Sequence, residues 1–218
     1  MADTRSLKER RPWGADQLSF SKGVKTATGT KDDFLRDNSA LLESFEKESD
    51  RGLALVAAVC FEAALERLLL ARFYCRTDKR AGLVNPLFDA FGPLSTFSAK
   101  IRVAYAIDLL QDWIAGDLDL VRKIRNEFAH NLESTTFHDA RIAGMVNQLA
   151  GFAKAAEWLK RDSRGRFDIA KIPHDKQSRF KFIWTCARIG ALLEAKVITQ
   201  GSDIPEQAKL KFMLSTRQ

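Results

Sequence analysis

The segment from about Arg51 to Tyr74 is apolar on nearly every side when it is drawn as a helix, and this feature restricts the fold more than any other. A helix that is apolar all round lies inside a protein or inside a membrane. This one lacks the charge-free length of a membrane span, because four charges interrupt it: Glu62, Glu66, Arg67 and Arg72. We therefore predict a central helix that other elements of the chain bury.

Amphipathic segments on both sides supply the covering elements. In each of them apolar residues recur at three- and four-residue spacings between charged ones, which is the pattern of a helix with one buried face. Such helices are predicted over 33–49, from Ser95 to Leu109, from Asp117 or Asp119 to Phe128, over 138–160 and over 176–195. No alternating strand pairs accompany them, so the sequence predicts an all-α helical bundle.

The 218 residues are enough for one hydrophobic core with appendages. The net charge of +7 is unevenly placed: residues 1–31 hold 7 basic and 3 acidic side chains, residues 32–153 hold 14 and 18, and residues 154–188 hold 10 and 4. Basic flanks of this kind contact a polyanion or form ordinary solvated surface. We predict a mobile basic arm over 1–31, a helical core over 32–160, and a basic linker with a C-terminal helical extension over 161–218.

The second basic flank holds the best candidates for polyanion contact. Four cations fall close together in it: Lys160, Arg161, Arg164 and Arg166. Phosphates attract such clusters through charge, without any reading of base sequence. We expect these four residues to bind nucleic acid phosphates.

One six-residue string, from Arg125 to His130, carries groups suited to chemistry. Three groups in it can together hold a phosphate and move a proton without a metal: the Arg125 guanidinium, the Asn126 amide and the His130 imidazole. Arg125 falls inside the apolar stripe of its helix, so we expect it to be largely buried in a structural ion pair with Glu62 or Glu66. At 100° per residue, His130 points about 140° away from Arg125. The two side chains meet only if the helix ends at His130 or a twofold copy completes the site.

A purely structural interpretation of the string stays open. In it, Arg125 is a core ion-pair residue and Asn126 lies on the surface. His130 is then a cation at the helix C-terminus, next to the free carbonyls, before Asn131 ends the helix.

The remaining sequence offers little further chemistry. The three histidines lack the close spacing and the Cys or carboxylate neighbours of a zinc site, so we expect no metal and no cofactor. Cys60, Cys75 and Cys186 are scattered in apolar or mixed segments, which predicts reduced packing thiols. The first residues carry charges and no apolar signal region, so we expect a soluble cytoplasmic protein without membrane contact.

Two stretches resemble a known family. They are Gly92-Pro93-Leu94-Ser95, continuing to Ala106, and Asp119 through Ile124-Arg125-Asn126-Glu127-Phe128-Ala129-His130. From about Arg51 to Asp139 the chain resembles the mannitol-operon-repressor (MltR-like) family. The resemblance implies an all-helical fold and a role in regulating a sugar-alcohol operon.

The string from Arg125 to His130 is also similar to the signature of the HEPN superfamily, whose active members are metal-independent endoribonucleases, many of them toxins or antiviral effectors. The resemblance implies that two subunits pair and that the 2'-hydroxyl of the RNA attacks the neighbouring phosphate. It assigns Arg125 to hold that phosphate, Asn126 to orient the phosphate or the imidazole, and His130 to act as general base or acid. The implied partners are a second copy of the chain in a homodimer, RNA, and an antitoxin or regulatory protein.

Two functions remain open from the sequence. One is a HEPN-type metal-independent endoribonuclease or RNA-binding module of toxin or defence type, which the intact string and the basic flanks favour. The other is a non-catalytic MltR-like transcriptional regulator that acts by binding protein or nucleic acid. The sequence contains no groove-reading motif of a sequence-specific DNA repressor.

Overall fold

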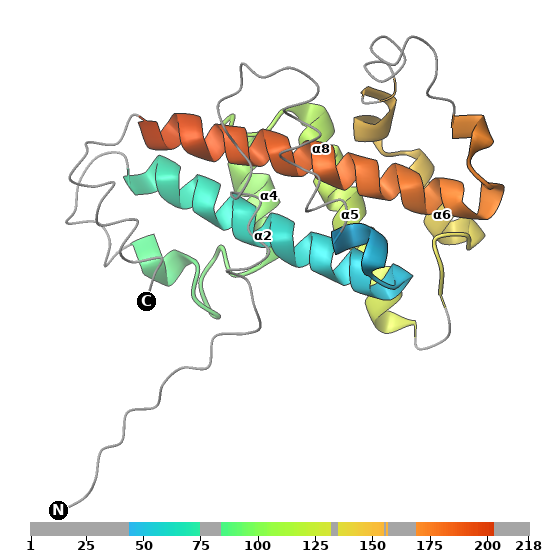
Figure 1. Cartoon of the computed structure of the whole chain (residues 1–218). Helices are drawn as coiled ribbons and strands as arrows, with labels where there is room; N and C mark the ends of the chain where they lie inside the picture. Colours follow the sequence, from blue (N-terminus) through green and yellow to red (C-terminus); the bar gives the residue numbers. More distant parts are fainter. Residues whose placement is uncertain (1–43, 75–83, 132–134, 155, 157–168, 203–218) are drawn as a thin grey trace, which may run out of the picture.

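The computed structural model describes residues 44–74, 84–131, 135–154, 156 and 169–202 (Figure 1). Its elements are, in chain order, α2 (Asp50–Tyr74), η3 (Asn85–Leu87), α4 (Phe97–Ala106), α5 (Asp112–His130), α6 (Ala140–Asn147), η4 (Ile169–Lys171) and α8 (His174–Ser202). Short helical stretches also occur at 44–47 and 150–154. These residues contain no β-strand, so the predicted all-α fold is confirmed. Within the same residues, no helix has the length and apolar character needed to cross a membrane.

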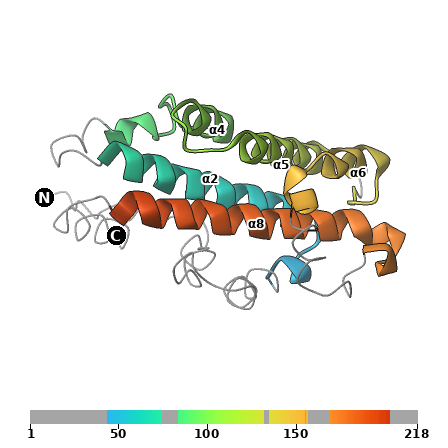
Figure 2. The ribbon, with the colours of Figure 1, turned by 90° about the horizontal axis from the view of Figure 1, so that it is seen from above.

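Helices α2 and α8 form the centre of the bundle and run side by side in the same direction (Figures 1 and 2). Two ion pairs join them in parallel: Asp50 pairs with Arg179 near the start of both helices, and Arg67 pairs with Glu194 further along both. Helices α4, α5 and α6 cover one face of this pair (Figure 2). The prediction of a central helix over about Arg51 to Tyr74 is therefore confirmed.

Helix α2 is central because apolar residues occupy most of its circumference. Its side chains Leu53, Phe61, Leu65 and Leu68 are fully buried against the neighbouring helices. Complete burial of a side chain of this size stabilises a fold by about 1.5–3 kcal/mol relative to exposure. A helix that is apolar on so many sides needs neighbours on several of them, and α4, α5 and α8 are those neighbours.

The helix predicted over 138–160 is divided in the structure. Helix α6 ends at Asn147, and a new helical stretch begins at 150. The break arises because the buried Asp117 carboxylate of α5 accepts hydrogen bonds from the backbone N–H groups of Ala150 and Gly151, at 2.8 and 2.7 Å. A side chain from another helix thus satisfies the free donors at a new helix start.

Two predicted helix starts also differ from the structure. Helix α4 begins at Phe97, and its N-cap is Thr96 rather than Ser95, because the Thr96 hydroxyl accepts a hydrogen bond from the Ala99 N–H at 3.2 Å. Helix α5 begins earlier than predicted, at Asp112, since Ile114 already belongs to its buried face.

Helix α8 shares the core of the other helices. Its side chains Phe182, Ile189 and Leu193 are fully buried there. The helix assigned from the sequence to a C-terminal extension is therefore part of the bundle itself. The predicted arm over 1–31, and residues 33–43 of the first predicted helix, lie outside the described residues.

Candidate functional site

Arg125, Asn126 and His130 lie on the last two turns of α5. Arg125 and Asn126 are half-buried, whereas His130 is exposed. Helix α5 ends at His130, which is one of the two conditions for a meeting of these side chains, but His130 itself is still helical and Asn131 is the C-cap residue. Regular helical geometry therefore keeps His130 about 140° round the axis from Arg125. A single chain does not bring the guanidinium and the imidazole together.

The predicted ion pair of Arg125 with Glu62 or Glu66 is wrong. Both carboxylates of α2 instead bind Lys100 of α4, whose Nζ lies 3.1 Å from Glu62 Oε1 and 2.9 Å from Glu66 Oε2. The reason is that α4 packs against α2 and brings Lys100, which is 4% exposed, to these carboxylates. Arg125 itself is half-buried and forms no ion pair with any residue that the structure describes.

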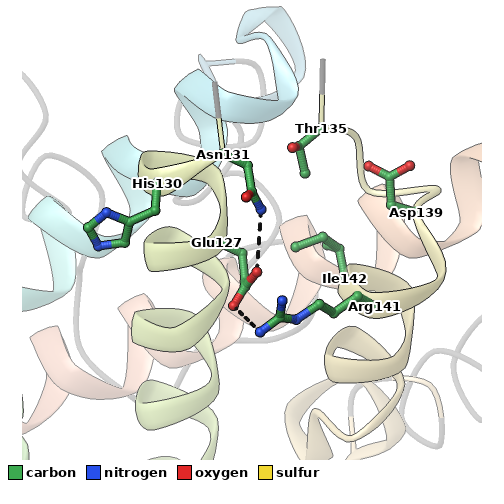
Figure 3. Close-up of a pocket in the computed structure, with 7 residues that line it drawn as sticks. All are labelled: Glu127, His130, Asn131, Thr135, Asp139, Arg141 and Ile142. Carbon is green, nitrogen blue, oxygen red and sulfur yellow. Dashed lines mark hydrogen bonds and ion pairs between the residues drawn. The ribbon is translucent and has the colours of Figure 1, made fainter. Parts of the chain in front are cut away.

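A hollow of about 530 Å³ lies between the end of α5 and the start of α6 (Figure 3). Its lining is polar apart from one side chain and consists of Glu127, His130, Asn131, Thr135, Asp139, Arg141 and Ile142. The imidazole of His130 points away from the other side chains in Figure 3. Among the residues of the string, Glu127 therefore faces the hollow more directly than His130 does.

Glu127 is at the centre of the contacts in this hollow. Its carboxylate binds the guanidinium of Arg141 at 2.8 Å and accepts a hydrogen bond from the Asn131 amide at 3.4 Å (Figure 3). Nearby, the Asp139 carboxylate accepts a hydrogen bond from the backbone N–H of Thr136 at 2.7 Å. These contacts hold the end of α5 against the start of α6. The sequence did not predict these contacts. Their only trace in it is one acidic residue within the string, Glu127, and one arginine after the next loop, Arg141.

A cation from α2 caps the end of α5. The Arg51 guanidinium donates a hydrogen bond to the backbone carbonyl of Asn131. The free carbonyls at a helix C-terminus attract positive charge there. His130 also lies in the last turn, and the predicted helix end at Asn131 is confirmed.

A second arginine joins three segments at the same end of the bundle. Arg179 of α8 pairs with Asp50 of α2 at 2.5 Å and donates to the backbone carbonyls of Phe45 and Glu48 at 3.0 and 2.6 Å. The Asp50 carboxylate also accepts a hydrogen bond from the backbone N–H of Phe137 at 2.9 Å. Arg179 belongs to the basic flank 154–188, so this charge of the flank is used to hold the fold together.

The other predicted site residues give fewer contacts. The cations predicted to bind nucleic acid lie outside the described residues: Lys160, Arg161, Arg164 and Arg166. Cys60 and Cys186 are buried thiols, and burial raises the pKa of the Cys60 thiol to about 11, which makes it a poor nucleophile. Cys75 is outside the described segments. Where side chains are described, no three His, Cys, Asp or Glu residues gather into a group that could hold a metal ion.

Comparison with known proteins identifies relatives of this fold. The family described as MtlR, mannitol repressor, matches residues 37–181. A chain of the MtlR–HPr complex from Escherichia coli is 18% identical, with a TM-score of 0.56 and coverage of 72% of this chain and 97% of that one. The possible transcriptional regulator YggD from Shigella flexneri 2a is 15% identical, with a TM-score of 0.57 and coverage of 77% and 99%. No curated protein matches the chain.

The structural matches, at these identities, show a shared fold. The family match extends beyond the stretch from Arg51 to Asp139 that carries the resemblance in the sequence, and it includes α2, α4, α5, α6 and the start of α8. It covers about two thirds of the 218 residues. The chain belongs to the mannitol repressor (MtlR) family.

Proposed function

We propose that this chain is a transcriptional regulator that acts by binding a protein partner. The observation that carries the proposal is the match to the mannitol repressor family over residues 37–181. Two solved relatives support it, since one comes from a complex of MtlR with HPr and the other is described as a possible transcriptional regulator. The separation of Arg125 and His130 around α5 favours binding over catalysis in a single chain.

The turn before α4 presents an aromatic side chain suited to a protein contact. Phe91 has a relative exposure of 102%. Its backbone is held in place, because the Leu94 N–H donates to the Leu87 carbonyl at 2.7 Å and a Cβ at Gly92 would lie only 2.3 Å from the Pro86 carbonyl oxygen. An aromatic residue on a fixed backbone provides contact area at a small cost in conformational entropy. We assign Phe91 to the partner surface.

HPr from the same organism is expected to form a complex with this chain, measured by size-exclusion chromatography and titration calorimetry. Phe91→Ser is expected to weaken that complex about 30-fold, the effect of losing a contact worth about 2 kcal/mol. The matched control is Val59→Ser, which removes another exposed apolar side chain, 60% exposed on α2. Absence of a complex at the highest soluble concentrations would contradict HPr as the partner. Equal weakening by both substitutions would contradict the assignment of Phe91.

One observation supports a HEPN-type endoribonuclease as a second candidate function. Arg125 has no ion pair with a described residue, and His130 is exposed. A facing copy of α5 in a twofold dimer could therefore place one chain's His130 beside the other chain's Arg125. The dimer itself stays a prediction, which light scattering tests.

Wild-type protein is expected to leave total RNA intact in the presence of EDTA. An enzyme of the HEPN type would cut RNA under these conditions, leave 2',3'-cyclic phosphate ends and spare DNA. His130→Ala would then reduce the rate by about 10²–10⁴, the usual contribution of a general acid or base. His138→Ala, at another exposed histidine, is the control. Cleavage that requires His130 but not His138 would overturn regulation as the only function.

A further inference from the structure

Two cations of the basic flank 154–188 lie against one indole ring. The Nζ atom of Lys154 is 5.5 Å from the centroid of the Trp113 ring, and the guanidinium carbon of Arg188 is 5.7 Å from it. Lys154 and Arg188 come from opposite ends of this flank, and the fold brings both of them next to α5. We call Trp113, Lys154 and Arg188 the Trp113 cluster.

The backbone around Gly151 determines where Lys154 lies. The Asp117 carboxylate starts the helical stretch 150–154 by accepting the N–H groups of Ala150 and Gly151. A Cβ at Gly151 would lie 2.9 Å from Asp117 Oδ2, 2.9 Å from Thr185 Cγ2 and 3.4 Å from the Trp113 ring. The helical stretch is therefore in direct contact with α5 and α8, and Lys154, one turn later, is brought beside Trp113.

The charges of the cluster form no ion pair within the described part of the chain. This holds for Lys154 and for Arg188, and the Nε atom of Arg188 is buried without a hydrogen-bond partner among the described residues. Burial also lowers the pKa of Arg188, because its half-buried side chain is partly removed from water. The carboxylate of Asp117 interacts with the charge of Lys154, but both of its oxygens already accept backbone N–H groups.

Three other cations in the bundle have carboxylate partners. Arg67 pairs with Glu194, Lys100 with Glu62 and Glu66, and Arg179 with Asp50. A half-buried cation without an anion loses hydration and regains little in exchange. Arg188 therefore has N–H donors that no described residue accepts, and the Trp113 indole ring lies beside its guanidinium.

We propose that Lys154 and Arg188 bind a phosphate group at the Trp113 cluster. An arginine offers a planar fork of N–H donors to phosphate oxygens, and a lysine adds a compact positive charge. Both charges lie close to the same ring centroid, at 5.5 and 5.7 Å from it. The phosphate comes from a small phosphorylated molecule or from the backbone of a single-stranded nucleic acid. This site does not depend on the protein-partner proposal.

The test follows the indole N–H resonance of Trp113, assigned with Trp113→Phe, by nuclear magnetic resonance. Inorganic phosphate and a short oligouridylate are titrated separately into the full chain, and at least one is expected to give a saturable shift. A shift with both probes or with phosphate alone supports a site for small phosphorylated molecules. A shift with oligouridylate alone supports a nucleic acid backbone, and its affinity should fall steeply with salt. No saturable shift with either probe would overturn the proposal.

Substitutions decide whether the two cations are responsible. Arg188→Gln and Lys154→Gln are each expected to weaken binding at least about tenfold, the effect of losing one charged hydrogen bond. Arg188→Lys keeps a positive charge and should retain part of the affinity, which separates binding from a loss of folding. The control is Lys123→Gln, because Lys123 is an exposed cation paired with Asp119 at 2.9 Å. Equal weakening by the control would overturn the assignment, since it would indicate a response to net charge alone.

Discussion

Arg67→Met is expected to lower the free energy of unfolding by about 3–5 kcal/mol, the usual effect of leaving one partner of a buried ion pair without the other. Glu194 of α8 is 2% exposed, and Arg67 of α2 is its ion-pair partner. The substitution keeps most of the side-chain volume of Arg67 but leaves the Glu194 carboxylate inside the bundle without a counterion. Urea denaturation at neutral pH measures the change.

The loss should depend on pH in a defined direction. Burial raises the pKa of Glu194 above its ordinary value of 4.5, and Arg67 opposes that rise. Without Arg67 the pKa rises further, so the folded state retains a proton that the unfolded state releases. The stability of the variant relative to wild type should therefore fall as pH rises from below 4.5 through the raised pKa.

Two controls accompany this substitution. Arg141→Met removes an arginine that is 76% exposed and pairs with Glu127, so it should cost no more than about 1 kcal/mol. Adding Glu194→Met to Arg67→Met should restore much of the stability, because an apolar pair can replace a buried ionic one. A cost for Arg67→Met no larger than that for Arg141→Met would contradict the prediction.

Phe137→Ala is the second substitution with a large expected effect, again about 3–5 kcal/mol. Phe137 is 1% exposed and lies between Phe128 of α5 and Phe182 of α8, with ring centroids 5.0 and 4.8 Å away. Its removal leaves a cavity where α5, α8 and the segment before α6 meet. The same segment lines the hollow beside Glu127, so the contact of Glu127 with Arg141 should also loosen.

Thermal or urea unfolding gives the stability change for Phe137→Ala. Phe91→Ala removes the same group from a fully exposed position and should change stability by no more than about 0.5 kcal/mol. If the two substitutions have similar effects, the three phenylalanine rings do not form a packed part of the core. Phe137→Leu should cost less than Phe137→Ala, since leucine fills more of the space.

The helices were predictable where a single periodic pattern determined them. The all-round apolar pattern from Arg51 to Tyr74 predicted α2 almost to its ends, and the helix predicted over 176–195 lies within α8. The break after α6 was not predictable in this way. It depends on Asp117, a residue more than thirty positions earlier, which supplies hydrogen-bond acceptors to Ala150 and Gly151. Local periodicity contains no information about such a distant cap.

The candidate site shows the same limit. The helical wheel correctly separated Arg125 from His130 on α5, because both positions depend on one helix alone. It could not identify the cation for Glu62 and Glu66, because Lys100 comes from a different helix. Which helix contacts which face is decided by packing of the whole bundle, and so is the approach of Lys154 and Arg188 to Trp113.

The parallel arrangement of α2 and α8 has a consequence for how the chain is made. The contacts of Asp50 with Arg179 and of Arg67 with Glu194 close loops of 129 and 127 residues. At a translation rate of about 5–20 residues per second, roughly 6–25 seconds pass between the synthesis of Arg67 on α2 and that of its partner Glu194 on α8. For that time part of the apolar surface of α2 has no native neighbour, and contacts this distant in sequence slow folding. A ribosome-bound chain that ends before α8 should therefore be a client for chaperones, and release of α8 from the ribosome should be the step that closes the core.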